Sequence, residues 1–504
     1  MFHASLTKAD GTQEQVEVWE PEEYELPILE FEKRGRGRRG NTADYYDAII
    51  NFDTETSKLT HYEDVCGEKI EMVDGVWLYQ WAVDFAGDLI AGRTVDSLVA
   101  FMKRVHTHYK LDSKAHMVWF CHNLPYDASY IVNALWKVFD HDIKMFATGQ
   151  RRPIRITCGK GLELRCSYKL VNKSLADWCE DVEPAHKKLV GEIDYGIIRT
   201  PSSALSVSDW DYMLNDVVCQ NECLQDLLAK EKLRTVPMTS TGFVRRAMRE
   251  ASTKDSRWRE RFRNTLPTAR QYQLLNKAFT GGYTHCNSFA MGIWENVQSF
   301  DAASMYPAVL ATEPMPNGKW VWRRIHKLDE LVRQCNDPHV ATVVDIIFDH
   351  IRLRDMFTWN PYISSSRCDI TKKHCLLDNG KVISANRIRI ALTDIDFRIV
   401  MEQYDFDWCA ILQVMECPRK MMPKWFLDAM RQWYIEKTQL KGVETVADKR
   451  RYLEAKQRLN AIYCTECAQL LMQETDTNTI LRNKIGKYQS VKRIWMALKR
   501  LLKK

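Results

Sequence analysis

Acidic residues near the start of the chain stand at a spacing that can hold a divalent cation. Asp53 and Glu55 lie two positions apart at the end of the apolar run DAIINFD, which is typical of a buried strand. Strand side chains alternate between two faces, so both carboxylates point to the same side. The spacing alone is weak evidence, because Asp181 and Glu183 repeat it where we see no role for it.

A third acid, Asp127, ends the stretch HNLPYD, which follows the expected strand MVWFC and leads into a helix. The stretch places Asp127 just beyond a strand end. It also groups His122, Asn123 and Tyr126, whose side chains can hydrogen-bond to a frayed nucleic-acid end and stack on it. Taken alone, the same residues would be read as an Asx-turn with a capping acid.

A fourth acid, Asp216, lies four residues after Tyr212 in a long helix that we expect Ser208 and Asp211 to open. Positions i and i+4 share a helix face. Asp216 can therefore bind a cation while the Tyr212 hydroxyl orients a water. The plain alternative is a partly buried tyrosine beside a solvated aspartate.

In this order and spacing, the three segments resemble the exonuclease motifs of family B DNA polymerases, and more broadly the DEDD group with its RNase H-like fold. The resemblance implies two Mg²⁺ or Mn²⁺ ions per active site, since these hard ions prefer carboxylates. It also implies two-metal hydrolysis of a DNA 3′ end. It assigns the ions to Asp53, Glu55, Asp127 and Asp216, the water to Tyr212, and the single-stranded primer end to His122, Asn123 and Tyr126.

Protein-primed members of this family carry a lysine just upstream of a stretch that reads G-[DE]-I-D-Y. Residues 191–195 match as GEIDY, but Val190 occupies the place of the lysine. Lys187 or Lys188 can take that role, and the sequence does not decide between them.

A second group of motifs begins at the stretch FDAASMYP, residues 300–307. We expect a strand at Val297–Asp301 that ends in an acid, followed by a helix; such an acid can hold Mg²⁺ beside a triphosphate. The pattern is also that of a common Asp-x-x-Ser turn, but it resembles motif A of family B polymerases, D-x-x-S-L-Y-P, with Met305 in place of leucine. The resemblance makes Asp301 a catalytic metal ligand, Tyr306 the gate against ribonucleotides and Ser304 a DNA contact.

Further along, Lys456, Asn460 and Tyr463 share one face of a long charged helix expected at Val446–Tyr463. A solvated charged helix would explain the segment equally well. The order resembles motif B, K-x-x-x-N-S-x-Y-G, with Ala461 and Cys464 as departures. The resemblance assigns the three residues to nucleotide binding.

Two elements complete the likeness. Residues 279–283, FTGGY, resemble the Y-x-G-G link between exonuclease and palm, where Gly281 and Gly282 allow the backbone close to DNA. The predicted hairpin turn Asn379-Gly380 and the strand after it resemble the terminal-protein region of protein-primed members. The implied partners are DNA, deoxynucleoside triphosphates (dNTPs) and a terminal protein that acts as primer.

The bulk composition agrees with a globular protein of several domains. The chain has 504 residues and a formal net charge of +6, which permits a polyanionic partner without requiring one. Its fifteen cysteines are scattered, as expected for reduced thiols. No apolar run is long enough to span a bilayer and no signal peptide opens the chain, so we expect no membrane partner and a place in the cytoplasm of a host cell.

The predicted fold class is mixed, α/β and α+β: an RNase H-like 3′–5′ exonuclease domain followed by a partial family B palm and fingers. The predicted segments are an extension with a basic Gly/Arg linker (1–45), the exonuclease domain (46–230), the partial polymerase domain (231–463) and an atypical basic tail (464–504). Motif C of the family does not follow motif B here, so we expect proofreading to be retained and synthesis to be impaired. The alternatives are a freestanding exonuclease relic and an inactive DNA-binding remnant.

Overall fold

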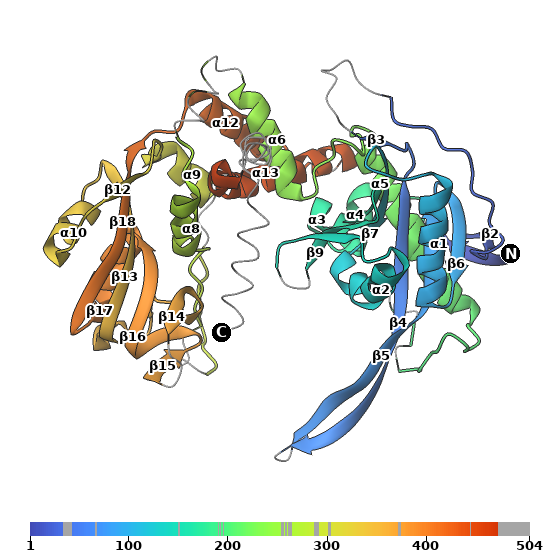
Figure 1. The fold of residues 1–504 in the computed structure, drawn as a ribbon, viewed down its shortest axis with the longest axis horizontal. Coiled ribbons are helices and arrows are strands. Elements are labelled where there is room, and N and C mark those ends of the chain that lie inside the picture. Colours follow the sequence, from blue (N-terminus) through green and yellow to red (C-terminus); the bar gives the residue numbers. More distant parts are fainter. Residues whose placement is uncertain are drawn as a thin grey trace. The chain divides into compact units, whose positions relative to one another are not determined.

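The structure, a computed structural model, describes residues 1–33, 43–65, 68–149, 152–189, 191, 193–194, 196–253, 257, 260, 265–286, 292–300, 304–370, 374–443 and 445–471. The chain divides into two compact units, Met1–Phe243 and a second from Val244 onward (Figure 1). Most of the basic linker and the C-terminal tail lie outside the described residues.

The first unit is built on a mixed sheet with the strand order β1-β2-β6-β5-β4-β7-β10-β9-β8, and β3 pairs with β7. The strands are β1 Phe2–Thr7, β2 Gln13–Trp19, β3 Asp44–Tyr45, β4 Ile50–Val65, β5 Glu68–Phe85, β6 Asp88–Gly92, β7 Ala115–Cys121, β8 Ile143–Ala147, β9 Pro153–Cys158 and β10 Leu162–Cys166. The central strands β4, β7 and β10 run parallel, whereas β5 and β6 pair antiparallel. The first two strands belong to this sheet, although the sequence suggested a separate extension.

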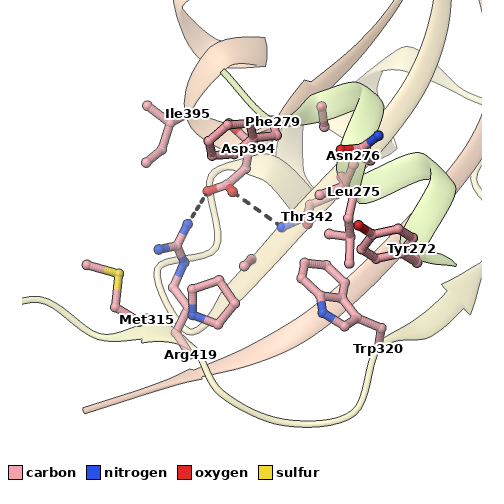
Figure 2. Close-up of a pocket in the computed structure, with 15 residues that line it drawn as sticks. Tyr272, Leu275, Asn276, Phe279, Met315, Trp320, Thr342, Asp394, Ile395 and Arg419 are labelled. Atoms are coloured by element: carbon pink, nitrogen blue, oxygen red, sulfur yellow. Dashed lines mark hydrogen bonds and ion pairs between the residues drawn. The ribbon is translucent and has the colours of Figure 1, made fainter. Parts of the chain in front are cut away.

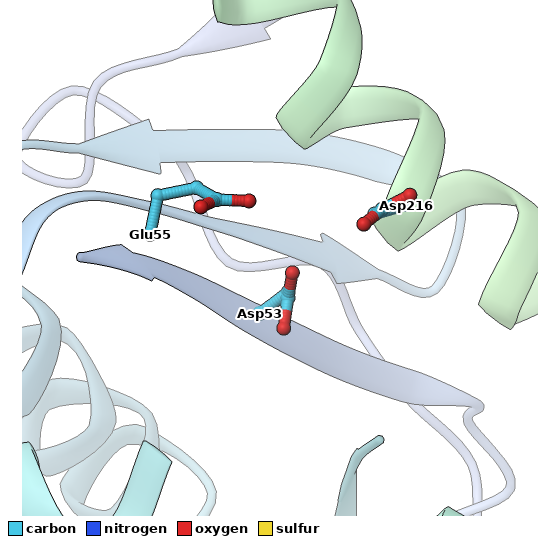
Figure 3. Close-up of side chains that lie close together, drawn as sticks. All are labelled: Asp53, Glu55 and Asp216. Carbon is cyan, nitrogen blue, oxygen red and sulfur yellow. The ribbon is translucent and has the colours of Figure 1, made fainter. Parts of the chain in front are cut away.

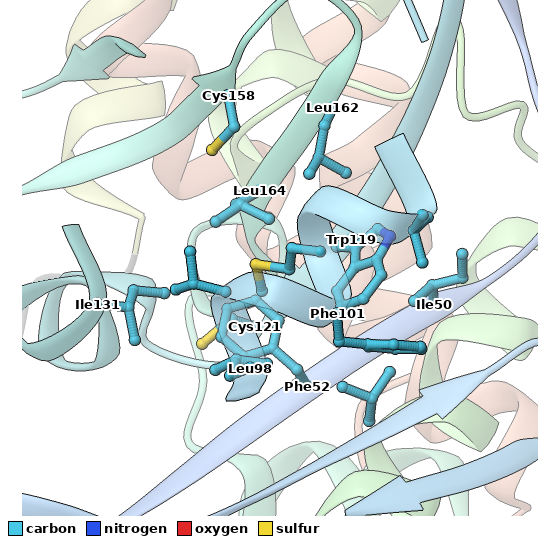
Figure 4. Close-up of a cluster of buried hydrophobic side chains, with 14 of the residues drawn as sticks. Ile50, Phe52, Leu98, Phe101, Trp119, Cys121, Ile131, Cys158, Leu162 and Leu164 are labelled. Atoms are coloured by element: carbon cyan, nitrogen blue, oxygen red, sulfur yellow. The ribbon is translucent and has the colours of Figure 1, made fainter. Parts of the chain in front are cut away.

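Helices cover both faces of this sheet. They are α1 Val95–His108, α2 Leu124–Val138, α3 Ser167–Val171, α4 Leu175–Val182 and α5 Val207–Leu228. The largest apolar cluster joins α1 and α2 to one face, with Phe52 and Trp119 at its centre (Figure 4). On the other face, the Asn51 side chain donates to the backbone carbonyl of Val217 in α5 at 2.8 Å. Odd-numbered residues at the start of β4 therefore face α5.

Several predicted elements of this unit are confirmed. The β-branched and aromatic run at 76–85 predicts a strand and the apolar spacing at 94–105 predicts a helix, which appear as β5 and α1, and the expected strand MVWFC appears as β7. The sequence Gly159-Lys160-Gly161 predicts a hairpin turn, and it joins the antiparallel strands β9 and β10.

Two helix starts were placed wrongly. Helix α2 begins at Leu124, three residues before the predicted start at Asp127, because Asn123 turns the chain in a left-handed conformation. The capping box of α5 is formed by Ser206 and Asp209, not by the predicted Ser208 and Asp211. Asp211 instead accepts a hydrogen bond from Thr7 of β1 at 2.8 Å.

Strands β4 and β5 continue far beyond the sheet as a two-stranded ribbon, which Figure 1 shows extending away from the helices. The sequence predicted only the first residues of β4, up to Asp53. The outer part carries mixed charged and apolar side chains, among them the exposed Leu59 and Tyr62. It lacks the apolar run by which a buried strand is recognised.

The second unit contains a sheet with the order β11-β18-β13-β16-β14, to which β12, β15 and β17 are added. Its strands are β11 Met315–Pro316, β12 Val321–Arg323, β13 Val340–Leu353, β14 Cys368–Ile370, β15 Cys375–Asp378, β16 Lys381–Thr393, β17 Tyr404–Asp405 and β18 Trp408–Lys420. The helices are α6 Ser240–Ser252, which crosses the division, α8 Ala269–Ala278, α9 Met305–Thr312, α10 Leu328–Cys335, α11 Asp394–Gln403, α12 Lys424–Gln439 and α13 Val446–Leu471.

The outcome of the predictions in this unit is divided. Asn379 and Gly380 both have positive φ, at 43° and 76°, as a tight turn between β15 and β16 requires, and the predicted hairpin is confirmed. The long charged helix is confirmed as α13. The strand expected at Val297–Asp301 is wrong for its described part, since Val297 and Phe300 are 74% and 88% exposed and belong to no element. Asp301 lies outside the described residues.

No helix in the described ranges is both long enough and apolar enough to cross a membrane.

Candidate active site

Three of the predicted acids converge on the α5 face of the first sheet. Asp53 and Glu55 extend from β4 toward Asp216, which projects from α5 (Figure 3). One carboxylate oxygen of each lies within 4.8 Å of the others. They meet because the odd-numbered residues at the start of β4 face α5. Asp216 lies next to Val217 in α5, and the backbone carbonyl of Val217 accepts a hydrogen bond from Asn51 of β4. The arrangement has the size and the donor type of a divalent-cation site.

Burial and mutual repulsion disfavour the charged forms of these acids. Burial, followed by the charges of Asp127, Asp216 and Glu55, raises the pKa of Asp53 well above its usual range. Burial and the charge of Asp216 raise the pKa of Glu55 to about 8. Asp53 and Glu55 therefore retain protons near neutral pH unless a cation compensates their charge.

The two oxygens of the Asp216 carboxylate have different hydrogen-bonding environments. Oδ2 accepts a hydrogen bond from the Lys188 ammonium, whereas Oδ1 is buried and has no hydrogen-bond partner within the described part of the chain. Burial raises the pKa of Asp216 and Lys188 lowers it, with the balance at about 6. A buried carboxylate oxygen without a donor is costly, and a bound cation would satisfy it. The residues present therefore fit a metal ion.

Of the two lysines that the sequence left open, Lys187 and Lys188, the one that lies beside the acids is Lys188. Its ammonium contacts Asp216, lies 3.5 Å from the Tyr212 hydroxyl and sits 4.9 Å from the centre of the Tyr212 ring. Burial would lower the pKa of Lys188, but the charge of Asp216 outweighs it and the pKa is raised. Lys187, in contrast, is exposed. No helix or strand spans this lysine pair, so no periodicity could have shown which one faces α5.

Asp127 lies beside the three acids but outside their group. It is buried in the first turn of α2, where its oxygens accept from the Thr54 hydroxyl at 2.6 Å and from the Cys121 thiol at 3.0 Å. Burial raises the pKa of Asp127 and these donors lower it, with the balance at about 6. Its charge is the first among neighbouring charges that raise the pKa of Asp53, so it belongs to the same electrostatic site.

The residues predicted for the DNA end differ in accessibility. Both ring nitrogens of His122 are engaged inside the protein, one with the Ser167 hydroxyl and one with the Lys173 carbonyl, each at 3.1 Å. Burial lowers the pKa of His122 to about 4, so the ring is neutral. Asn123 and Tyr126 are exposed, with 46% of Tyr126 accessible. Of the three, Asn123 and Tyr126 are exposed, whereas His122 is half-buried and its ring nitrogens are engaged inside the protein.

In the second unit, Ser304 and Tyr306 lie at the start of α9. Ser304 is the N-cap, with a left-handed backbone, and its hydroxyl accepts from the Lys437 ammonium of α12 at 3.0 Å. A Cβ atom on Gly282 would lie 3.1 Å from the Tyr306 hydroxyl, whereas one on Gly281 would meet no atom within 4 Å. The FTGGY segment therefore borders motif A. Sequence reasoning missed Lys437, because it belongs to none of the motifs.

The predicted nucleotide-binding face of α13 is partly described. Lys456 and Asn460 are exposed, while Ala455 and Leu459 of the same helix are buried. The side chain of Tyr463 lies outside the described residues, as does Asp301.

A cavity of about 390 Å³ lies between α8 and the second sheet (Figure 2). Its walls are largely apolar, with Phe279, Tyr272 and Trp320 among them. At its floor, Arg419 donates to the Asp394 carboxylate at 2.6 Å, and the backbone N–H of Thr342 donates to the same group. Arg419, Asp394 and the Thr342 N–H therefore satisfy one another at this wall of the cavity.

Comparison with known proteins gives one family and one recurring fold. Residues 211–354 match the family described as DNA polymerase type B, organellar and viral. Phi29 DNA polymerase complexed with single-stranded DNA has a TM-score of 0.54 at 16% identity, over 82% of this chain and 67% of that one. Its post-translocation binary complex with primer-template DNA gives 0.53 at 16% identity, over 82% and 66%.

The ternary complex of phi29 DNA polymerase with primer-template DNA and incoming nucleotides gives 0.51 at 16% identity, over 82% and 67%. The chain thus spans about two thirds of the length of these polymerases. No curated protein matches the sequence. At this identity the likeness shows the fold, and it confirms the predicted mixed architecture.

Proposed function

We propose that the first unit is a 3′→5′ exonuclease acting on single-stranded DNA, and the match of residues 211–354 to the organellar and viral type B DNA polymerases supports this proposal. Two observations carry the proposal: one carboxylate oxygen each of Asp53, Glu55 and Asp216 lies within 4.8 Å of the others, and the buried Asp216 Oδ1 has no hydrogen-bond partner among the residues that the structure describes. Such a group of acids is destabilising without a cation, and hydrolysis of a phosphodiester is the chemistry that paired hard cations serve.

The proposed cofactors are two Mg²⁺ or Mn²⁺ ions held by Asp53, Glu55, Asp127 and Asp216. When bound, such ions lower the pKa of a water and stabilise the leaving 3′ oxygen. The side chains of this chain would supply the frame, because β4 and α5 are rigid elements on which carboxylates keep their positions.

Lys188 and Tyr212 have a different proposed task. The Lys188 ammonium keeps Asp216 oriented and lies beside the Tyr212 hydroxyl. The hydroxyl can accept from or donate to a water near the acids, which would fix the direction of attack. Asn123, the N-cap of α2, and Tyr126, in the first turn of α2, are exposed and would receive the terminal nucleotides by hydrogen bonding and stacking.

The test is degradation of a 5′-labelled single-stranded oligonucleotide by the full chain with Mg²⁺ or Mn²⁺. The wild type should shorten the strand from its 3′ end, and Asp53→Ala and Asp216→Asn should not. The matched control is Glu183→Gln, which alters the other Asp-x-Glu pair, outside the candidate site. The proposal fails if the wild type leaves the strand intact, or if Asp53→Ala degrades it at the wild-type rate.

A second proposed activity is DNA synthesis primed by a hydroxyl on a terminal protein, as part of viral or plasmid DNA replication. The supporting observations are the family match, which includes Ser304 and Tyr306, and the approach of Lys437 to motif A. The acid assigned to this reaction is Asp301, and dNTPs are the substrates. Incorporation of labelled dNTPs that disappears in Asp301→Ala supports this proposal, and incorporation that survives the substitution refutes the role of Asp301.

A further inference from the structure

The Asp127 carboxylate is held differently from the other three acids. The Thr54 hydroxyl donates to Oδ1 at 2.6 Å and the Cys121 thiol donates to Oδ2 at 3.0 Å. Asp127 is only 2% exposed, so water competes little with these bonds. Each oxygen therefore has its own neutral donor from the protein.

The two donors come from neighbouring strands. Thr54 lies between Asp53 and Glu55 on β4, and its side chain points to the opposite face of the strand. Cys121 is the last residue of β7, which pairs with β4 a few residues earlier. Because the Asp127 backbone belongs to α2, the carboxylate is tied to three elements at once and cannot rotate without breaking a hydrogen bond.

We propose that Thr54 and Cys121 are positioning residues that fix the orientation of the Asp127 carboxylate at the end of β7, where it contributes to binding the second divalent cation. This inference rests on the exonuclease function proposed above. Both residues act through Asp127 and need no contact with DNA. Donors behind a metal ligand set its orientation, and their loss commonly costs about 10–100-fold in metal affinity or activity.

The experiment counts bound Mn²⁺ on the full chain by electron paramagnetic resonance, and follows the exonuclease rate against Mn²⁺ concentration. Thr54→Val removes the hydroxyl at nearly constant volume and should weaken the second Mn²⁺ by about 10–100-fold while the first is retained. Thr54→Ser keeps the donor and should restore most of the affinity. Cys121→Ala should show a smaller loss, because a thiol is a weak donor, and Cys121→Ser should reverse it.

Two controls separate positioning from general damage. Cys158→Ala removes another buried thiol of the same apolar cluster, one that contacts no acid of the site, and should leave Mn²⁺ binding unchanged. In the Asp127→Asn background, Thr54→Val should cause no further loss, since both changes act on one ligand.

Wild-type Mn²⁺ affinity in both Thr54→Val and Cys121→Ala overturns the inference. So does a Thr54→Val loss that persists in full in the Asp127→Asn background. If the chain binds two Mn²⁺ ions but degrades no DNA, the proposed exonuclease function is refuted. The number of Mn²⁺ ions bound by Thr54→Val then still tests the role of Thr54. If Thr54→Val does not fold, the Cys121 pair of variants gives the same decision.

Discussion

The two units present their candidate residues in contrasting ways. In the first, acids from β4, α2 and α5 lie in a largely buried site, where burial and neighbouring charges raise the pKa of Glu55 and burial raises that of Asp216. In the second, the described motif residues stand on accessible surface, with Tyr306 39% exposed and Lys456 open to solvent. A cluster of buried acids with raised pKa values destabilises the folded state, and such clusters are typical of functional sites. The chemistry of the first unit can therefore be argued from contacts, whereas that of the second depends more on resemblance.

Asp53→Asn should have the largest effect among the substitutions that test the buried acids of the first unit. We expect the exonuclease rate to fall by about 1,000-fold or more, a loss at least as large as that of one key transition-state contact. The same change should raise the melting temperature of the metal-free chain, because it removes one of several repelling carboxylates. Paired measurements of oligonucleotide degradation and thermal unfolding check both parts. A variant that is slower but less stable would contradict the repulsion.

Lys188→Met should produce the next largest effect. Removing the ammonium leaves the buried Asp216 carboxylate without its cationic partner, and breaking such a pair costs roughly 3 kcal/mol. We expect a lower denaturation midpoint and an exonuclease rate reduced by about 10–100-fold. Lys187→Met is the matched control, since that neighbour is exposed and should tolerate the change. Equal effects of the two substitutions would remove Lys188 from the site.

The pH dependence of stability gives a third, smaller effect. The pKa is about 8 for Glu55 and about 6 for Asp127 and Asp216, above the ordinary value of about 4, so the folded state binds more protons than the unfolded one in this range. Stability without metal should therefore fall as the pH rises from 4 to 8. Saturating Mg²⁺ should remove most of that decline, because the cation binds the deprotonated acids. Thermal unfolding across the pH range, with Mg²⁺ or with a chelator, measures it. A stability that rises over this range without metal would contradict the buried cluster.

The sequence predicted the acids of the first unit because their spacing carries geometric meaning. Two carboxylates two apart on a strand must share a face, and a helical acid four residues from a tyrosine must share its side. Neither statement needs long-range information. Local patterns of apolar runs and helical periodicity predicted an α/β sheet, whereas the RNase H-like fold class was what the resemblance to family B polymerases implied.

What could not be predicted depends on contacts between distant segments. The choice of Lys188 over Lys187 is made by α5, and the two hydrogen bonds on Asp127 are made by strands β4 and β7. His122 was expected to face DNA, but Ser167 and Lys173 occupy both of its nitrogens. A residue type indicates which bonds a side chain can form, and only the fold determines which partner reaches it.

The smallest expected effect tests the second unit, where one contact joins two motifs. Gly282→Ala would place a methyl group 3.1 Å from the Tyr306 hydroxyl, a distance that requires a shift of a few tenths of an ångström. We expect a stability loss below about 1 kcal/mol, in the range of mild overpacking at an accessible site. Gly281→Ala is the matched control, since its added carbon meets nothing within 4 Å. Denaturant unfolding of both variants measures the difference. If they are equally stable, the two motifs do not touch as described; if Gly282→Ala alone is weakened, the second unit also has a site defined by contacts.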